Sequence, residues 1–467
     1  MVASINRIPP EILALIPDFL DTDEKDEDVI TLTHVCRAWR GIFISRSSLW
    51  ADIDCEDREK TLVYFERSRS SPINLSLDRH DHMFPDDPFF EIIPHAIGRL
   101  VSLFIWGGPE NLQDITGHLC RPAPLLEELA IRSFNIDRSN MLPPALLDGD
   151  LSSLHKLYLE SVRTELPWRK MVNLTSFVLG RTLPGEVSVR QLLDFFEGAP
   201  HLRDINLYSA TLTPGAQNGR VVTLACLKKM AIVDCGPSSS LLDYLLIPVG
   251  AALTMQADLT GSLVGEILPR SLDNLRNLSN FTTIQLSNGG PYPRMNFGGP
   301  NGRVNVILTN TRVEWTGLML ESLTELDTSK MERLVIDRGL SQTRERLHQA
   351  LLPMINLRTI TLSKCGGPQI FIQALQPGTS SSEVVVCPKL EELVLVPRLG
   401  EGSYGIRNVI RMAAARASRG MKLGTVRISC RQDELDPVYV SELGQHIRHV
   451  EYDPRLVQLT VNNDQEV

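Results

Sequence analysis

Residues that could do chemistry occur in this sequence as fragments of catalytic patterns. The run 402–405 reads Gly-Ser-Tyr-Gly, which is half of the turn that presents a catalytic serine. Glu401 stands where that turn needs its first glycine, so we predict a turn before a helix and not a nucleophile. A hydrolase is disfavoured because no nucleophile, base and orienting group stand in a recognisable arrangement.

Metal-ligand residue types occur at Asp78, His80, Asp81 and His82. Alternating ligands in a proline-rich loop give no fixed geometry, whereas a catalytic zinc site needs three positioned ligands, so we predict no metal and no other cofactor. His446 and His449 have the spacing of a possible metal-ligand pair, but their side chains need not point to one site. The eight cysteines include no Cys-X-X-Cys pair, which argues against a zinc site and a disulfide framework.

Two further stretches carry weaker signals. Residues 287–303 are rich in glycine and proline, but a predicted strand follows them where a phosphate-binding loop would open a helix, so we expect an exposed insertion. A basic row could receive a phosphorylated or acidic motif, although such a row is more often the solvated face of an outer helix. Its residues are Arg407, Arg411, Arg416, Arg419 and Lys422.

Composition limits the class of protein. The chain has 467 residues and a formal net charge of −9, which argues against general binding to nucleic acids or anionic membranes. No signal peptide and no apolar run long enough to span a bilayer is recognisable. We therefore expect an intracellular protein of the cytoplasm and/or nucleus.

The elements that organise the chain begin with an N-terminal stretch, residues 5–53. Pro10 and Glu11 suit the first turn of a helix. An apolar stripe at helical spacing follows, in which Pro17 should end or kink the helix near Ile16. A second stripe continues for about three turns. The stripes are Ile12, Leu13, Ile16, Phe19 and Leu20, and then Leu32, Val35, Cys36, Trp39, Ile42 and Phe43.

The runs Ile-Pro-Pro-Glu-Ile-Leu (8–13), Val-Cys-Arg-Ala-Trp-Arg (35–40) and Leu49-Trp50 resemble the F-box. In that family the module binds the Skp adaptor of Skp–cullin–F-box ubiquitin ligases. The resemblance implies that one residue set contacts the adaptor or shapes its docking face. The set is Ile8, Pro9, Ile12, Leu13, Ile16, Leu20, Val35, Cys36, Trp39, Leu49 and Trp50.

Two features depart from the family pattern. Pro17 falls where the first helix usually continues. The run 21–28 contains six acids and one lysine, and we expect it to be a solvated connection between helices. Its alternative role is electrostatic steering of a basic partner.

Beyond this module we expect a linker helix and a first strand and loop (54–98), a repeat array (99–456) and a flexible tail (457–467). The array is predicted from a recurring spacing: apolar, two residues, apolar, one residue, apolar. Its starts are mostly about 20 to 33 residues apart, as in solenoids. The triplets begin at Leu100, Leu126, Leu154, Leu174, Leu202, Leu227, Phe281, Met331, Leu357, Leu390, Leu423 and Ile447.

This spacing resembles leucine-rich repeats, with Asn135, Cys235 and Cys365 at the terminal position of the repeat signature. We expect the α/β fold class: an all-helical F-box followed by an irregular leucine-rich-repeat solenoid, with a parallel sheet lining a horseshoe and helices on its outer face. Candidate return helices are 189–198, 344–354 and 404–419.

Strand alternation predicts which side chains face away from the core. The candidates for binding a substrate are Arg132, Lys156, Tyr158, Asp204, Asn206, Tyr208, Arg333 and Arg427. Five further residues share that face: Lys229, Gln285, Asp337, Glu392 and Glu451. Solenoid surfaces of this kind bind proteins, although each residue alone could simply be solvated.

The resemblance to the F-box implies a non-catalytic substrate receptor of a Skp–cullin–F-box ligase. It would contact the Skp adaptor, through it the cullin and RING subunits, and a protein substrate, but neither nucleic acid nor membrane. The alternative is a scaffold that belongs to no ligase and whose N-terminal helices cap the solenoid.

Overall fold

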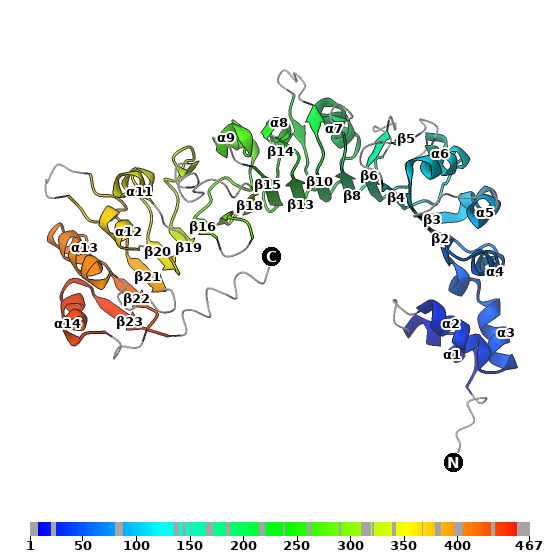
Figure 1. The fold of residues 1–467 in the computed structure, drawn as a ribbon, viewed down its shortest axis with the longest axis horizontal. Coiled ribbons are helices and arrows are strands. Elements are labelled where there is room, and N and C mark those ends of the chain that lie inside the picture. Colours follow the sequence, from blue (N-terminus) through cyan, green and yellow to red (C-terminus); the bar gives the residue numbers. More distant parts are fainter. Residues whose placement is uncertain are drawn as a thin grey trace, which may run out of the picture. The chain divides into compact units, whose positions relative to one another are not determined.

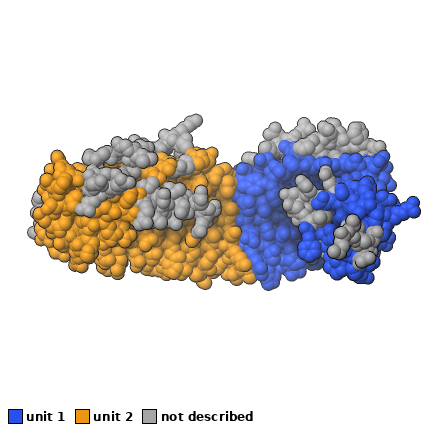
Figure 2. Space-filling view, turned by 90° about the horizontal axis from the view of Figure 1, so that it is seen from below, with its two compact units in different colours: residues 1–215 blue, residues 216–467 orange. Residues whose placement is uncertain are grey.

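The structure is a computed structural model of residues 1–467. It describes residues 8–19, 25–79, 87–134, 140–142, 146–149, 151–164, 171–183, 187–213, 220–236, 239–258, 263–288, 291–309, 319, 322–338, 342–366, 368–378, 384–396, 405–430 and 435–454. The chain divides into two compact units, residues 1–215 and 216–467 (Figures 1 and 2).

Unit 1 begins with short helices. The first helix ends at Leu13, three residues before the expected end near Ile16, and Pro17 lies in a separate 3-10 turn. The elements are α1 (Pro10–Leu13), η2 (Ile16–Phe19), α2 (Lys25–His34), α3 (Arg37–Ser45) and η3 (Ser47–Trp50).

Two expectations for this region were wrong. The second apolar stripe is not one helix, because Cys36 is extended (φ −162°, ψ 174°) and separates α2 from α3. The acidic run is not wholly a connection, because α2 starts at Lys25 and takes in Asp26, Glu27 and Asp28. Carboxylates in the first turn of a helix are favoured by its dipole.

The rest of unit 1 is a parallel sheet with helices on one side (Figure 1). Its strands pair in chain order: β1 (Asp52–Asp54), β2 (Ile73–Arg79), β3 (Leu100–Gly107), β4 (Glu128–Ser133), β6 (Lys156–Glu160), β8 (Ser176–Gly180) and β10 (Asp204–Tyr208). Strand β2, which we expected in the linker, pairs directly with β3.

Helices and short pairs complete unit 1. Its further helices are α4 (Arg58–Ser68), α5 (Pro88–Ala96), α6 (Pro109–His118) and α7 (Val189–Gly198), with 3-10 turns η4 (Ile97–Arg99) and η5 (Leu146–Gly149). The short strands β5 (Asn140–Leu142), β7 (Val162–Thr164), β9 (Val187–Ser188) and β11 (Leu212–Thr213) pair as β5–β7 and β9–β11. Helix α7 matches its expected range because Ser188 and Gln191 form a capping box.

Unit 2 carries a mostly parallel sheet whose order is β13–β15–β18–β17–β16–β19–β20–β21–β22–β23. The strands are β13 (Lys229–Val233), β15 (Ala252–Ala257), β16 (Thr283–Ser287), β17 (Arg294–Gly299), β18 (Gly302–Leu308), β19 (Arg333–Asp337), β20 (Thr359–Ser363), β21 (Glu392–Val396), β22 (Thr425–Ile428) and β23 (His449–Tyr452).

The antiparallel meander β16–β17–β18 corrects the expectation of an exposed insertion at 287–303. Strand β17 pairs with both β16 and β18, and its Met295 and Phe297 are buried. Gly302 permits the tight β17–β18 turn, because its φ is 137° and a Cβ there would lie 2.9 Å from the Ala251 carbonyl oxygen.

The helices of unit 2 lie on one side of its sheet (Figure 1). They are α8 (Ser239–Leu242), α9 (Leu263–Glu266), α11 (Arg344–Leu351), α12 (Pro368–Ala374), α13 (Ile406–Ser418) and α14 (Pro437–His446), with the 3-10 turn η7 (Leu272–Asn274) and the short strands β12 (Val222–Thr223) and β14 (Leu245–Leu246). Two of the three expected return helices end close to their predicted limits, at Leu351 and Ser418.

The apolar triplets form the core between sheet and helices. All three positions are buried in every triplet from the one at Leu100 to the one at Leu423, whereas the last buries only Ile447. The intervening strand residues face away from the core, as the alternation predicted. The fold is therefore mixed α/β, with N-terminal helices and a large, mostly parallel sheet.

Candidate functional site

Apolar side chains remain exposed along the N-terminal helices. Phe19 is 86% exposed and Ile12 is 54% exposed. Burying a side chain of this size contributes roughly 1.5–3 kcal/mol, so exposed residues of this kind are candidates for contact with a partner. We call this set the N-terminal apolar surface: Ile8, Ile12, Leu15, Phe19 and Val35.

The opposite side of these helices is a small core. The Trp39 and Phe43 rings meet edge to face, with centroids 5.6 Å apart. Trp50 is fully buried: its Nε1 donates to the Phe43 carbonyl oxygen at 3.0 Å, and its ring meets that of Tyr64 on α4 at 4.9 Å. Trp50 therefore joins the N-terminal helices to α4.

The predicted adaptor-binding residues divide between these two sides. Exposed members are Ile8, Pro9, Ile12 and Val35, half-buried members are Ile16 and Cys36, and buried members are Leu13, Trp39, Leu49 and Trp50, while Leu20 lies outside the described residues. The buried four shape the surface but do not present their side chains to a partner. Leu15 and Phe19 are also exposed but were not in the predicted set, although the steps Ile8, Ile12, Leu15, Phe19 of four, three and four residues carry the signal.

The predicted substrate-binding residues all lie on the face of the sheet that is turned away from the helices. In unit 1 they occupy β4, β6 and β10, and in unit 2 they occupy β19 and β22. None is buried. The structure brings Arg132, Tyr158 and Tyr208 into one network but places Arg333 and Arg427 on separate strands of unit 2.

Glu160 is the centre of the unit 1 network, and sequence reasoning missed it. Its carboxylate is only 2% exposed, and it meets Nε of Arg132 at 2.8 Å and Nε of Arg181 at 3.2 Å. Tyr158 donates its hydroxyl to Glu160 at 2.5 Å, and the Tyr158 and Tyr208 hydroxyls lie 2.6 Å apart. The alternation Lys156, Tyr158, Glu160 was the available signal.

Burial controls the acid–base properties of this network. Burial, followed by the hydrogen bond to Glu160, raises the pKa of Tyr158, and burial followed by the hydrogen bond to Tyr158 raises the pKa of Tyr208 strongly. Arg132 also lies over the Trp106 ring at 4.3 Å. With both arginines paired to Glu160 and the pKa of both tyrosines raised, the four side chains are gathered around one buried carboxylate.

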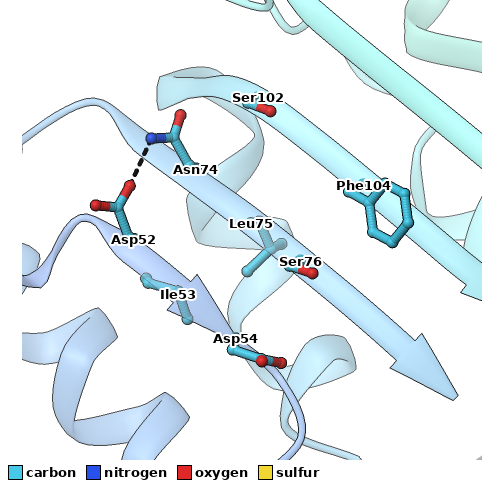
Figure 3. A pocket seen from close by; sticks show the side chains of 8 residues that line it. All are labelled: Asp52, Ile53, Asp54, Asn74, Leu75, Ser76, Ser102 and Phe104. Atoms are coloured by element: carbon cyan, nitrogen blue, oxygen red, sulfur yellow. Dashed lines mark hydrogen bonds between the residues drawn. The ribbon is translucent and has the colours of Figure 1, made fainter. Parts of the chain in front are cut away.

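A pocket of about 190 Å³ lies at the β1–β2–β3 end of this face (Figure 3). Within it Asn74 Nδ2 donates to Asp52 Oδ1 at 2.6 Å. The lining provides two serine hydroxyls but no histidine or lysine to activate them. Its residues are Asp52, Ile53, Asp54, Asn74, Leu75, Ser76, Ser102 and Phe104.

The basic row near residue 410 is not one surface, which corrects the sequence-based expectation. Arg416 is fully buried, and it donates to the carbonyl oxygens of Val386 at 3.1 Å and Cys387 at 2.7 Å. Burial lowers its pKa. Arg419 donates to the Gly378 carbonyl, while Arg407 and Arg411 remain exposed.

The described residues include no group of three or more His, Cys, Asp or Glu side chains placed to hold a metal ion. His80, Asp81 and His82 fall outside that part of the chain. None of its helices combines the length and apolar character needed to cross a membrane.

Comparison with known proteins bears on the N-terminal helices. A family model described as F-box-like matches residues 5–56. No curated protein matches the chain. The match covers the helices that carry the N-terminal apolar surface and the Trp39–Trp50 core, and it supports the resemblance on which their binding role was predicted. The N-terminal segment of the chain is an F-box-like domain.

Proposed function

We propose that this protein is a substrate receptor of a Skp–cullin–F-box ubiquitin ligase. The observation that carries the proposal is the N-terminal apolar surface, which lies within the F-box-like domain. Five large apolar side chains there are open to a partner, while Leu13, Trp39 and Trp50 hold the helices beneath them. An F-box-like domain indicates a role as an adaptor-binding component of a ubiquitin ligase complex.

The remainder of the chain is proposed to be an irregular leucine-rich-repeat array that holds the target protein. The buried triplets, the parallel pairing of successive strands and the helices on one side support this assignment. The other side of the sheet carries polar and aromatic side chains. Such a surface suits a protein partner.

In this role the chain acts by proximity. Binding the target and the adaptor at once raises the effective concentration of target lysines near the conjugating enzyme. No nucleophile, metal or nucleotide of this chain is required. The exposed side chains and not the buried tryptophans would provide the adaptor contact.

Co-expression with a Skp-type adaptor tests the proposal. Wild type is expected to elute from size-exclusion chromatography as a one-to-one complex. Ile12→Asp/Phe19→Asp should elute alone while keeping the wild-type melting temperature, since both side chains are exposed. Ile355→Asp/Val384→Asp provides the matched control, because it introduces the same charges at exposed apolar positions of unit 2.

The alternative, a scaffold that uses its N-terminal helices as a cap, makes the opposite prediction. The packing of Trp50 against Tyr64 on α4 favours it. In that case wild type stays free of the adaptor and the Ile12→Asp/Phe19→Asp variant behaves like wild type. A complex that survives both substitutions would mean that the adaptor binds elsewhere.

A further inference from the structure

Three arginines on the open sheet face of unit 2 lack ionic partners, whereas several cations of unit 1, and Arg427 on β22, are paired. In unit 1 Arg132 and Arg181 pair with Glu160, and Lys156 pairs with Glu128. In unit 2 the meander and its neighbours present Arg294, Arg303 and Arg333, and none of these has an ion pair or a side-chain hydrogen bond among the described residues.

Amide side chains lie beside these arginines in register. Gln285 on β16 stands opposite Asn296 on β17, which stands opposite Asn305 on β18. The three therefore form a ladder across adjacent strands. We call the combined set the amide–arginine surface: Gln285, Arg294, Asn296, Arg303, Asn305 and Arg333.

The antiparallel meander creates this surface. Its other face buries Ile284, Met295 and Val304, so strand alternation turns the polar set outward. Along the register that joins β18 to β19, Arg303 and Arg333 are separated by Gly298 and Thr283. Three strand spacings of about 4.8 Å put their Cα atoms about 14 Å apart, with small side chains between them.

Two polar atoms of this surface are buried yet unsatisfied. Arg294 Nε and Asn305 Oδ1 have no hydrogen-bond partner among the described residues. A buried polar group without a partner costs about 1–3 kcal/mol, so a ligand gains affinity if rotation of the Arg294 or Asn305 side chain lets it supply the missing partner. Nε requires an acceptor and Oδ1 requires a donor.

We propose that the amide–arginine surface binds an extended polypeptide segment rich in aspartate and glutamate. An extended main chain offers both N–H and C=O groups, which the ladder of amides can match. Its carboxylates complement the arginines, and Asp337 is the one acid among the described face positions of β13 and β15 to β19.

The same chemistry disfavours other anions. A phosphodiester backbone has no donor for Asn305 Oδ1. A phosphorylated side chain is usually held by a cluster of arginines, whereas Arg303 and Arg333 stand about 14 Å apart. The chain as a whole carries a formal charge of −9, so it repels an acidic peptide at long range. Any attraction of that peptide must therefore come from the arginines of this surface.

This inference names the target class for the proposed receptor and rests on that role for its biological use, but peptide binding is measurable without the adaptor. The probe is a fluorescein-labelled peptide of about twelve residues, long enough to span the arginines, with alternating Glu and Ser. Fluorescence anisotropy with the full-length chain should show saturable binding that weakens with salt. A Lys–Ser peptide should not bind.

Arg303→Glu/Arg333→Glu is expected to weaken binding at least about tenfold, because like charges then face the probe. Arg344→Glu/Arg411→Glu carries the same charge change on exposed positions of α11 and α13 and should leave affinity within about twofold. Asn296→Ala/Asn305→Ala keeps the net charge and should weaken binding by about threefold or more. Equal melting temperatures confirm that the variants fold.

Four outcomes would overturn the proposal. The first is absence of binding by wild type, and the second is an equal loss of affinity in Arg344→Glu/Arg411→Glu. The third is unchanged affinity in Arg303→Glu/Arg333→Glu. The fourth is displacement of the probe by oligodeoxythymidine or a phosphoserine peptide at lower concentration than by unlabelled Glu–Ser peptide. Because the adaptor is absent from this assay, these outcomes remain distinguishable from failure of the ligase role.

Discussion

The ring of Tyr208 lies directly over Gly180 on the neighbouring strand. The two residues are register partners in β10 and β8, and a Cβ placed on Gly180 would come within 2.2 Å of Tyr208 Cζ. Gly180 thus provides the space that lets the Tyr208 hydroxyl reach Tyr158 at 2.6 Å. The glycine is needed for the close approach of a side chain and not for its own backbone angles.

Gly180→Ala is therefore expected to displace Tyr208 and break its hydrogen bond to Tyr158. Overpacking of this kind costs about 1–3 kcal/mol, which urea denaturation would measure as a lower unfolding free energy. Gly298→Ala is the matched strand control, because its Cβ would meet only Thr283 at 3.9 Å. Equal stabilities for the two variants would contradict the packing argument.

The pH dependence of stability tests the same network. Because the native pKa values of Tyr158 and Tyr208 are raised, the unfolded chain releases these protons first, above pH of about 10. Their contribution is complete below that pH, and the unfolding free energy should fall as pH rises beyond it. Tyr208→Phe should flatten this fall in urea titrations at pH 9 to 11, and profiles parallel to wild type would refute it.

Arg416 is expected to be a determinant of stability. Arg416→Met keeps most of the volume but leaves the carbonyl oxygens of Leu375, Val386 and Cys387 without their donor. Each buried unsatisfied group costs about 1–3 kcal/mol, so we expect a loss of roughly 3 kcal/mol or more. Arg411→Met, on the exposed side of α13, should change the unfolding free energy by less than about 0.5 kcal/mol.

Cysteine reactivity should divide by burial. Burial, followed by the charge of Asp337, raises the pKa of Cys365 to about 12, and burial raises that of Cys387 to about 12. Cys120 and Cys226 are exposed. A thiol reagent at pH of about 8 should therefore label Cys120 and Cys226 in the native protein, with Cys365 and Cys387 labelled only after unfolding. Mass spectrometry of labelled peptides measures this, and labelling of Cys365 or Cys387 in the native protein would contradict the prediction.

The apolar triplets were predictable because a strand with one buried face imposes a fixed spacing. From Leu100 to Leu423 their positions are buried, and helix α7 follows its capping residues. Pro17 correctly indicated that the first helix is interrupted, although the helix ends at Leu13 and not near Ile16. The sequence was therefore sufficient to predict an element where its own residues determine its spacing or its ends.

Other features depended on partners distant in the sequence. Strand β17 was hidden by glycines and prolines, although Met295 and Phe297 alternate, because its pairing with β16 and β18 decides its state. The basic row was predicted as one surface because the spacing of its residues around the helix was not considered. Val409, Met412, Ala413 and Arg416 recur at helical spacing on the buried side of α13, which contained the signal for Arg416.

The position of β16 has a consequence for synthesis and folding. From β15 the order of strands across the sheet is β18, β17, β16, which reverses their order in the chain. Strand β15 therefore pairs with β18 and not with β16, the next of these strands to leave the ribosome. The edge of β15 must wait, unpaired, until the whole meander has emerged. An open strand edge invites intermolecular pairing, so we expect unit 2 to be prone to aggregation during this interval. Shortening the β17–β18 turn would not relieve it, because the delay comes from the strand order.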